Sequence, residues 1–141
     1  MAQQAVAIQD ARILVVEDDD NNRLIATKLL QLAGVNEANI FMLEGDPLPF
    51  LQAQLPQCVN LILLDLQLPG KDGYAILEEL RTDAALAQIP VMAMTANVMK
   101  TDMERIQAAG FDGFIGKPIN ARLFGEWVRR SLSGEIMWTN Q

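Results

Sequence analysis

The sequence predicts a single doubly wound α/β domain with a central parallel sheet. Short apolar runs of strand length alternate about five times with segments of helical periodicity, and the connections between them are short. In the stretch from Asn60 to Asp65, residues 61–64 are continuously apolar, which is typical of a strand buried on both faces of a parallel sheet. A chain of 141 residues is also long enough for one domain with its own core.

Each element is predicted from its local pattern. Strands are placed on apolar runs, and helices where apolar residues recur every three or four positions. Glycines at 34 and 110 are expected to end helices, and Asp46–Pro47 to begin one. In chain order we predict a lead-in 1–11, strand 12–16, helix 21–33, strand 39–43, a short helix through Leu48, Leu51 and Leu55, strand 60–65, helix 72–81, strand 90–94, helix 98–109, strand 112–116, a helix capped by Asn120 and ending at Leu132, and a tail 133–141.

The apolar stripe of each helix is expected to face the core. The residues predicted to point inward are Ile25, Leu29 and Leu32 in the first helix, Leu77 and Leu80 in the third, Met99, Met103 and Ile106 in the fourth, and Phe124, Val128 and Leu132 in the last.

Composition excludes several classes of function. The net charge of −7 argues against DNA or an anionic membrane as the main partner, because phosphate-rich surfaces need a cationic protein. No run is long and apolar enough for a transmembrane helix, and the first residues do not resemble a signal peptide. The single cysteine, Cys58, excludes an internal disulfide and favours a cytoplasmic location. The absence of histidine excludes a histidine-based triad, a histidine metal site and a phosphohistidine on this chain.

Chemically distinctive residues follow the ends of four predicted strands. They are Glu17 and Asp18, Asp65, Thr95 and Lys117. The carboxyl ends of parallel strands meet at one edge of a sheet, where ligands bind in folds of this class. Clustered carboxylates repel each other unless a cation joins them, and oxygen ligands favour a hard ion such as Mg²⁺.

A simple metal site does not require the lysine or the hydroxyl. They suit an arriving phosphoryl group, whose oxygens Lys117 would neutralise and Thr95 would contact through a hydrogen bond. A carboxylate held in line could then act as the nucleophile and become an acyl phosphate. Taken singly, each residue has a simpler interpretation: Asp65 could cap a loop or helix, and Asp19 and Asp20 are typical helix caps. The hypothesis depends on their joint placement.

The chain resembles the receiver domains of bacterial two-component response regulators, also called CheY-like. The resemblance runs from about residue 12 to 132, and the motifs stand in the family's order at the strand ends. They are Val15-Val16-Glu17-Asp18-Asp19, Leu64-Asp65-Leu66-Gln67-Leu68-Pro69-Gly70-Lys71-Asp72-Gly73, Met94-Thr95-Ala96 and Gly116-Lys117-Pro118. The resemblance implies a flavodoxin-like sheet of five strands in the order 2-1-3-4-5, the arrangement for which this family is a standard example.

The resemblance also implies roles at the metal and phosphoryl sites. Asp65 would be the phosphoacceptor, and Asp18 and Asp65 would bind Mg²⁺ directly. Glu17, which replaces the commoner aspartate, would bind the ion through water. The backbone carbonyl of Gln67 would complete the protein ligands, and Lys117 would pair with the phosphoryl oxygens.

Further implied roles concern access and switching. Thr95 would contact the phosphoryl group and act together with Phe114, which occupies the position of the family's aromatic switch. Ala96 would leave room for the phosphoryl group. Gln67 and Asn97 lie where the family tunes self-dephosphorylation. The Lys117–Pro118 peptide would be cis.

The implied function is signalling rather than enzymatic turnover of an outside substrate. A histidine kinase or histidine phosphotransfer protein would supply the phosphoryl group, and hydrolysis would remove it. Phosphorylation would switch a face formed by the fourth helix, fifth strand and fifth helix, to which a downstream protein would bind. We expect no direct binding to nucleic acid or membrane, and a monomer or weak homodimer.

Four alternatives stay open. The chain could be a stand-alone regulator, which the short tail with Met137 and Trp138 favours, or the receiver of a hybrid histidine kinase. A flavodoxin-like cofactor carrier would need a phosphate-binding loop where this chain has acids. An aspartate-nucleophile phosphatase would need a second acid where Gln67 stands. An inert module with an acidic pocket would show no affinity for Mg²⁺.

Overall fold

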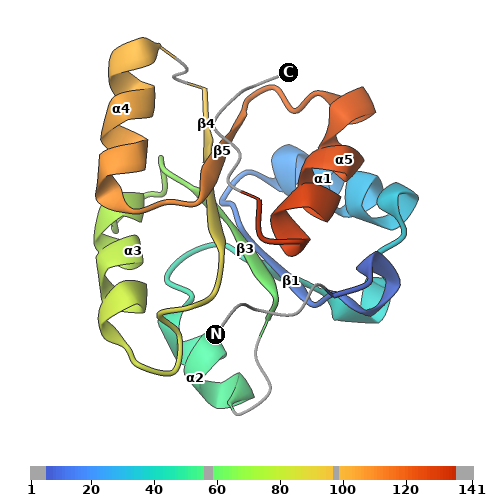
Figure 1. Cartoon of the computed structure of the whole chain (residues 1–141), viewed down its shortest axis with the longest axis horizontal. Coiled ribbons are helices and arrows are strands. Elements are labelled where there is room, and N and C mark those ends of the chain that lie inside the picture. Colours follow the sequence, from blue (N-terminus) through green and yellow to red (C-terminus); the bar gives the residue numbers. More distant parts are fainter. Residues whose placement is uncertain (1–5, 56–58, 97–98, 136–141) are drawn as a thin grey trace.

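The computed structural model describes residues 6–55, 59–96 and 99–135 (Figure 1). It confirms the α/β class. The sheet has five parallel strands in the order β2-β1-β3-β4-β5, as the family resemblance implied. The strands are β1 (Ile13–Val16), β2 (Ile40–Leu43), β3 (Leu61–Asp65), β4 (Val91–Thr95) and β5 (Gly113–Gly116). The helices are α1 (Asp20–Ala33), α2 (Leu48–Gln54), α3 (Gly73–Thr82), α4 (Lys100–Ala109) and α5 (Ala121–Leu132).

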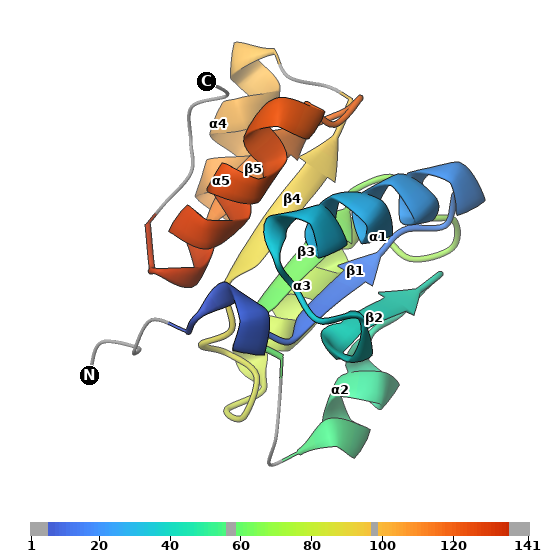
Figure 2. The same cartoon turned by 90° about the vertical axis from the view of Figure 1, so that its right-hand side faces the viewer.

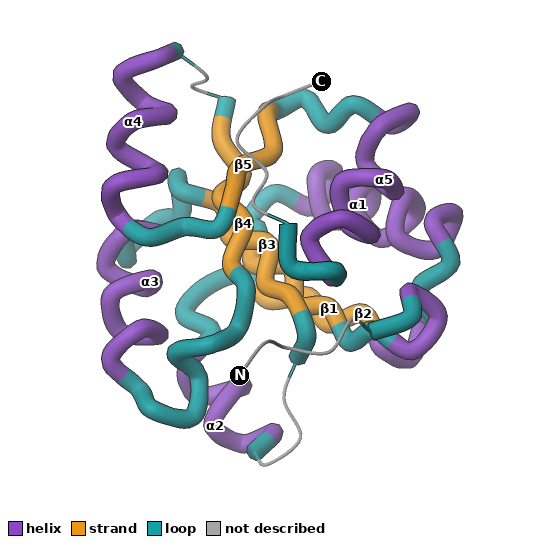
Figure 3. The backbone as a smooth tube through the Cα atoms, viewed as in Figure 1, coloured by secondary structure: helices purple, strands orange, loops and turns teal. Residues whose placement is uncertain are grey.

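Helices cover both faces of the sheet (Figures 2 and 3). α1 and α5 lie on one face, and α2, α3 and α4 lie on the other. Alternate residues of each central strand enter opposite cores: Leu14 and Ile62 pack toward α3, whereas Ile13 and Leu61 pack toward α1 and α5. Both faces of the strand are therefore buried, which explains why the strand sequences are continuously apolar.

Asp19 and Asn120 cap helices as predicted, Asp72 is the cap of a helix that was predicted to include it, and α2 has Pro47 rather than Asp46 as its N-cap. The side chains of Asp19, Asp72 and Asn120 accept hydrogen bonds from backbone N–H groups in the first turns of α1, α3 and α5. Gly34 and Gly110 end α1 and α4 in the left-handed conformation, which glycine adopts without steric cost. These caps fix where each helix begins beside the sheet edge.

The predicted inward face of α1 is wrong by one position along the helix. Leu29 is partly buried against the core, but Ile25 and Leu32 are 45% and 82% exposed, and the buried residues are Ala26, Leu30 and Ala33. Apolar residues occupy so many positions of α1 that two stripes were possible. The stripe with the smaller side chains is buried because α1 approaches α5 closely. A Cβ atom on Gly125 would lie 3.2 Å from the Cβ of Ala33.

Smaller differences concern helix ends and the lead-in. Met99 is the N-cap of α4 and is 71% exposed, so it does not join the buried stripe of that helix. α2 ends at Gln54, and Leu55 follows it as a partly exposed cap. Residues 6–11, expected to belong to a frayed lead-in, contain a 3-10 turn at Ile8–Asp10. Among the described residues, no helix has the length and apolar character needed to cross a membrane.

We predict that Gly73→Ala destabilises the domain by about 1 to 3 kcal/mol, because overpacking forces the backbone to move. A Cβ atom on Gly73 would lie 3.0 Å from the Cα of Leu66 and 3.2 Å from the carbonyl oxygen of Asp65. Gly45→Ala is the matched control, because nothing lies within 4 Å of its added Cβ. Urea unfolding of both variants measures the difference. Equal stability of the two variants would contradict the close packing of the loop after β3.

Candidate functional site

The sequence-predicted site residues meet at the carboxyl edge of the sheet. Asp65 is the last residue of the central strand β3, and Thr95 is the last residue of β4. Glu17 directly follows β1, and Lys117 directly follows β5. Parallel pairing brings these strand ends together, as the sequence predicted.

Three carboxylates form a compact cluster there. Oxygen atoms of Glu17, Asp18 and Asp65 all lie within 4.8 Å of one another. Glu17 and Asp65 are 1% and 2% exposed, whereas Asp18 faces solvent. The cluster therefore presents buried anionic oxygens with one side open to water. Such an oxygen-only donor set suits a hard divalent cation.

Lys117 bridges the two buried carboxylates. Its Nζ lies 2.8 Å from Oε2 of Glu17 and 3.0 Å from Oδ2 of Asp65, and its side chain is 17% exposed. Burial acts to lower the pKa of Lys117, but hydrogen bonds to Glu17 and Asp65 outweigh it and raise the pKa above its ordinary value. The ammonium is thus firmly charged and is paired with the Asp65 carboxylate.

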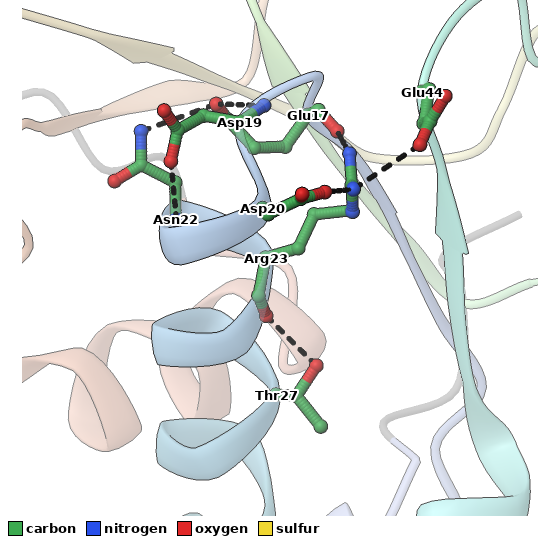
Figure 4. Close-up of polar contacts among 7 residues, drawn as sticks. All are labelled: Glu17, Asp19, Asp20, Asn22, Arg23, Thr27 and Glu44. Atoms are coloured by element: carbon green, nitrogen blue, oxygen red, sulfur yellow. Dashed lines mark hydrogen bonds and ion pairs between the residues drawn. The ribbon is translucent and has the colours of Figure 1, made fainter.

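Glu17 is held by several donors besides Lys117 (Figure 4). Its Oε1 accepts from the side-chain amide of Asn22 at 3.2 Å and from the N–H of Asp19 at 3.3 Å. Burial raises the pKa of the Glu17 carboxyl, and the nearby Asp65 adds to the rise, while Lys117 and Asn22 oppose it. Burying this carboxylate is costly, and its donors offset part of that cost.

The two oxygens of Asp65 have different partners. Oδ1 accepts from the backbone N–H of Gln67 at 2.9 Å, and Oδ2 faces Lys117. This arrangement fixes the rotation of the carboxylate at the strand end. Gln67 and Ala96 are exposed at the rim, whereas Thr95 is 3% exposed. The N–H of Lys117 donates to the carbonyl of Thr95 at 2.8 Å, which ties the ends of β4 and β5 together.

The remaining sequence-predicted residues fall in three groups. The Lys117–Pro118 peptide is cis, as the resemblance implied. Phe114 is 7% exposed and packs in the core with Ile106 and Phe111. Asn97, like Cys58 and the tail with Met137 and Trp138, lies outside the described residues.

The sequence analysis did not identify two features beside the site. Asn22 and Arg23 contact Glu17 from the first turn of α1, and their spacing after the acidic cluster was the available signal. A cavity of about 390 Å³ also adjoins the site, with Gln67 and Thr95 among its lining residues. Arg105 and Tyr74 also line this cavity, and the Arg105 guanidinium stacks on the Tyr74 ring, 4.2 Å from the ring centroid.

Comparisons with known proteins agree with this geometry. The family model described as "Response regulator receiver domain" matches residues 13–129. The polar-differentiation response regulator DivK of Brucella ovis is 34% identical over 120 residues, which cover 85% of this chain and 94% of DivK. Among solved structures, the receiver domain of a Pseudomonas aeruginosa sensor histidine kinase has a TM-score of 0.71 and 26% identity, covering 89% of this chain and 98% of that one. That structure holds a magnesium ion in its active-site cleft.

A second solved structure supports the fold alone. The chemotaxis response regulator CheY4 of Vibrio cholerae has a TM-score of 0.73 at 21% identity, covering 85% of this chain and 97% of that one.

We predict that Lys117→Met strengthens Mg²⁺ binding by at least about fivefold. The ammonium lies about 3 Å from two of the carboxylates and therefore competes with a divalent cation. A unit charge at 4 Å is worth about 1 to 4 kcal/mol between bulk water and an effective dielectric of about 20, and 1.4 kcal/mol is about tenfold. Calorimetric titration of metal-free protein measures the affinity.

Lys28→Met is the control for the Lys117 variant, because it removes the same charge from an exposed position on α1. Its affinity for Mg²⁺ should stay within about twofold of the wild type, since exposed charges are strongly screened. An unchanged or weaker affinity in Lys117→Met would contradict the competition.

Proposed function

The chain belongs to the response regulator receiver domain family of two-component signalling, and on that premise we propose that Asp65 accepts a phosphoryl group from a partner's phosphohistidine. The observation that carries the proposal is the Asp65 carboxylate, held by Lys117 at 3.0 Å within a cluster of three carboxylates. The donor is a histidine kinase or a histidine phosphotransfer protein, because this chain contains no histidine.

The proposed cation is Mg²⁺. Asp18 and Asp65 bind it directly, Glu17 binds it through water, and the backbone carbonyl of Gln67 adds a further oxygen. The mutual distances of the carboxylate oxygens and the absence of nitrogen or sulfur ligands in the cluster support a hard cation. When bound, the ion neutralises part of the charge on the phosphoryl oxygens.

The proposed transfer is an in-line displacement. A carboxylate oxygen of Asp65 attacks phosphorus while the phosphorus–nitrogen bond of the donor breaks, and the imidazole nitrogen leaves with the electron pair. Lys117 and the hydroxyl of Thr95 stabilise the charge on the equatorial oxygens, and the small Ala96 leaves the approach open. Water later attacks the phosphorus, which releases inorganic phosphate and restores the carboxylate. Gln67 and Asn97 set the rate of this self-dephosphorylation.

The proposed output is a change in a protein-binding face. Phosphorylation adds about −1.5 to −2 units of charge beside Thr95 and Lys117. Thr95 and Phe114 relay this change to the face formed by α4, β5 and α5, where a downstream protein binds. The burial of Phe114 supports an inward position of this side chain as one of the two states. The phosphoryl group then shifts the balance only by its different affinity for the two states.

We further propose that the exposed apolar residues of α1 dock the phosphodonor. Leu24, Ile25 and Leu32 are 58%, 45% and 82% exposed, an unusual concentration on one helix. Ile25 also lines a small cavity with Glu17, Lys117 and Pro118, so this end of the apolar surface adjoins the acceptor site. A partner that rests on α1 can therefore place its histidine over Asp65.

Incubation with Mg²⁺ and acetyl phosphate should add one phosphoryl group to the protein, measured by intact mass. Asp65→Asn should abolish the gain, because an amide is not a nucleophile in this reaction, and EDTA should abolish it in the wild type. A gain that persists in Asp65→Asn would place the acceptor elsewhere. No gain from either acetyl phosphate or a phosphorylated histidine kinase would contradict the phosphoacceptor function.

Ile25→Asp should slow transfer from a phosphorylated histidine phosphotransfer protein by at least about tenfold, because it puts a charge into the apolar contact. Its rate with acetyl phosphate should remain within about twofold, since that donor needs no docking. Met99→Asp is the control, because it places the same charge at an exposed position on α4. Equal slowing with both donors would mean that Ile25 acts on the site itself.

A further inference from the structure

Arg23 connects the acidic loop after β1 to the rest of the sheet edge (Figure 4). It lies in the first turn of α1, and its side chain is 16% exposed. Nη1 donates to the backbone carbonyl of Glu17 at 2.8 Å. Nη2 forms an ion pair with Asp20 and another with Glu44 at 3.2 Å, beyond the end of β2. One guanidinium thus holds three segments together.

The hydrogen bond to the Glu17 carbonyl fixes the peptide that precedes Asp18. The N–H of Glu17 donates to the carbonyl of Leu43 at 2.9 Å, so both backbone groups of Glu17 are bound. Asp18 is exposed and is attached through this same peptide. The position of its carboxylate relative to Asp65 therefore depends on the contact between Arg23 and Glu17.

We propose that Arg23 is a positioning residue for divalent-cation binding. It acts through the backbone of Glu17 and holds Asp18 at the distance from Asp65 that a shared cation needs. This inference rests on the proposed cation site. Residues that orient metal ligands in this way typically change metal affinity about 10- to 100-fold when they are substituted.

The two ion pairs of Arg23 are not the important contacts. Asp20 and Glu44 are 90% and 76% exposed, and exposed ion pairs contribute little. They do orient the guanidinium and offset its charge. The bond to the Glu17 carbonyl is the one that reaches the site. Thr27 stabilises the same turn by donating from its hydroxyl to the Arg23 carbonyl at 2.9 Å.

The sign of the effect separates positioning from simple electrostatics. Removing a positive charge near an acidic cluster should strengthen cation binding if the charge acts only through its field. Removing a positioning contact should weaken it. Arg23→Gln therefore gives opposite results under the two explanations. Arg23→Lys keeps the charge but lacks the planar fork that reaches several partners at once, so positioning alone predicts a loss there too.

The experiment is calorimetric titration of metal-free protein with Mg²⁺, together with urea unfolding of each variant. We expect both Arg23→Gln and Arg23→Lys to bind Mg²⁺ roughly tenfold more weakly than the wild type. Glu44→Gln is the control, because it removes an outer ion pair and leaves the donor to Glu17 in place. Its affinity should stay within about twofold.

The outcomes distinguish the inference from the proposed function. If the wild type binds Mg²⁺ and both Arg23 variants bind it equally or more tightly, the positioning role is overturned and the cation site is not. Weaker Mg²⁺ binding that follows the loss of stability in urea, and that also occurs in Glu44→Gln, would overturn the positioning role too. The effect on affinity would then reflect a general loss of structure. A wild type that binds no Mg²⁺ would overturn the cation site and this inference together.

Discussion

The structure depends on how the charges of three clustered carboxylates are balanced at one edge of the sheet. Parallel pairing brings Glu17, Asp18 and Asp65 to within 4.8 Å of each other, and two of them are almost completely buried. Lys117 contributes one positive charge to these three negative ones. The cluster therefore keeps an excess of two negative charges, which favours a further cation. An ion pair with this degree of burial gives little net stability after desolvation, so its value lies in chemistry rather than in folding.

Most of the fold and the site could be predicted because each functional residue ends or follows a strand. A buried parallel strand has a distinctive apolar sequence, and its last residue is marked by the change to polar side chains. Once the topology is parallel, the positions of Asp65, Thr95 and Lys117 at one edge follow without further information. The caps at Asp19 and Asn120 were predictable for a similar reason, because capping is a local interaction between neighbours in sequence.

Tertiary packing explains what the sequence did not predict. In α1 the apolar pattern allowed two stripes, and the contact of Ala33 with Gly125 selected the smaller one. That choice leaves Ile25 and Leu32 on the surface, so the error in the core prediction coincides with the proposed docking surface. Arg23 was missed because a polar residue in a first helical turn is usually solvated. Its proposed role depends on the hydrogen bond to the Glu17 carbonyl, which the sequence pattern alone does not reveal.

Glu17 and Asp65 share the ammonium of Lys117, and this limits how the proposed acyl phosphate can be stabilised. In the structure, the Lys117 ammonium pairs with Glu17 and Asp65 together. A phosphoryl group on Asp65 adds about −1.5 to −2 units of charge and competes for the same ammonium. If Lys117 turns toward the phosphoryl oxygens, the buried Glu17 loses its main positive partner and keeps only the neutral donors Asn22 and Asp19. A buried carboxylate without a positive partner is costly, so the phosphorylated state needs a cation more than the resting state does. The same reasoning makes the precise placement of Asp18, and hence Arg23, matter most after phosphoryl transfer.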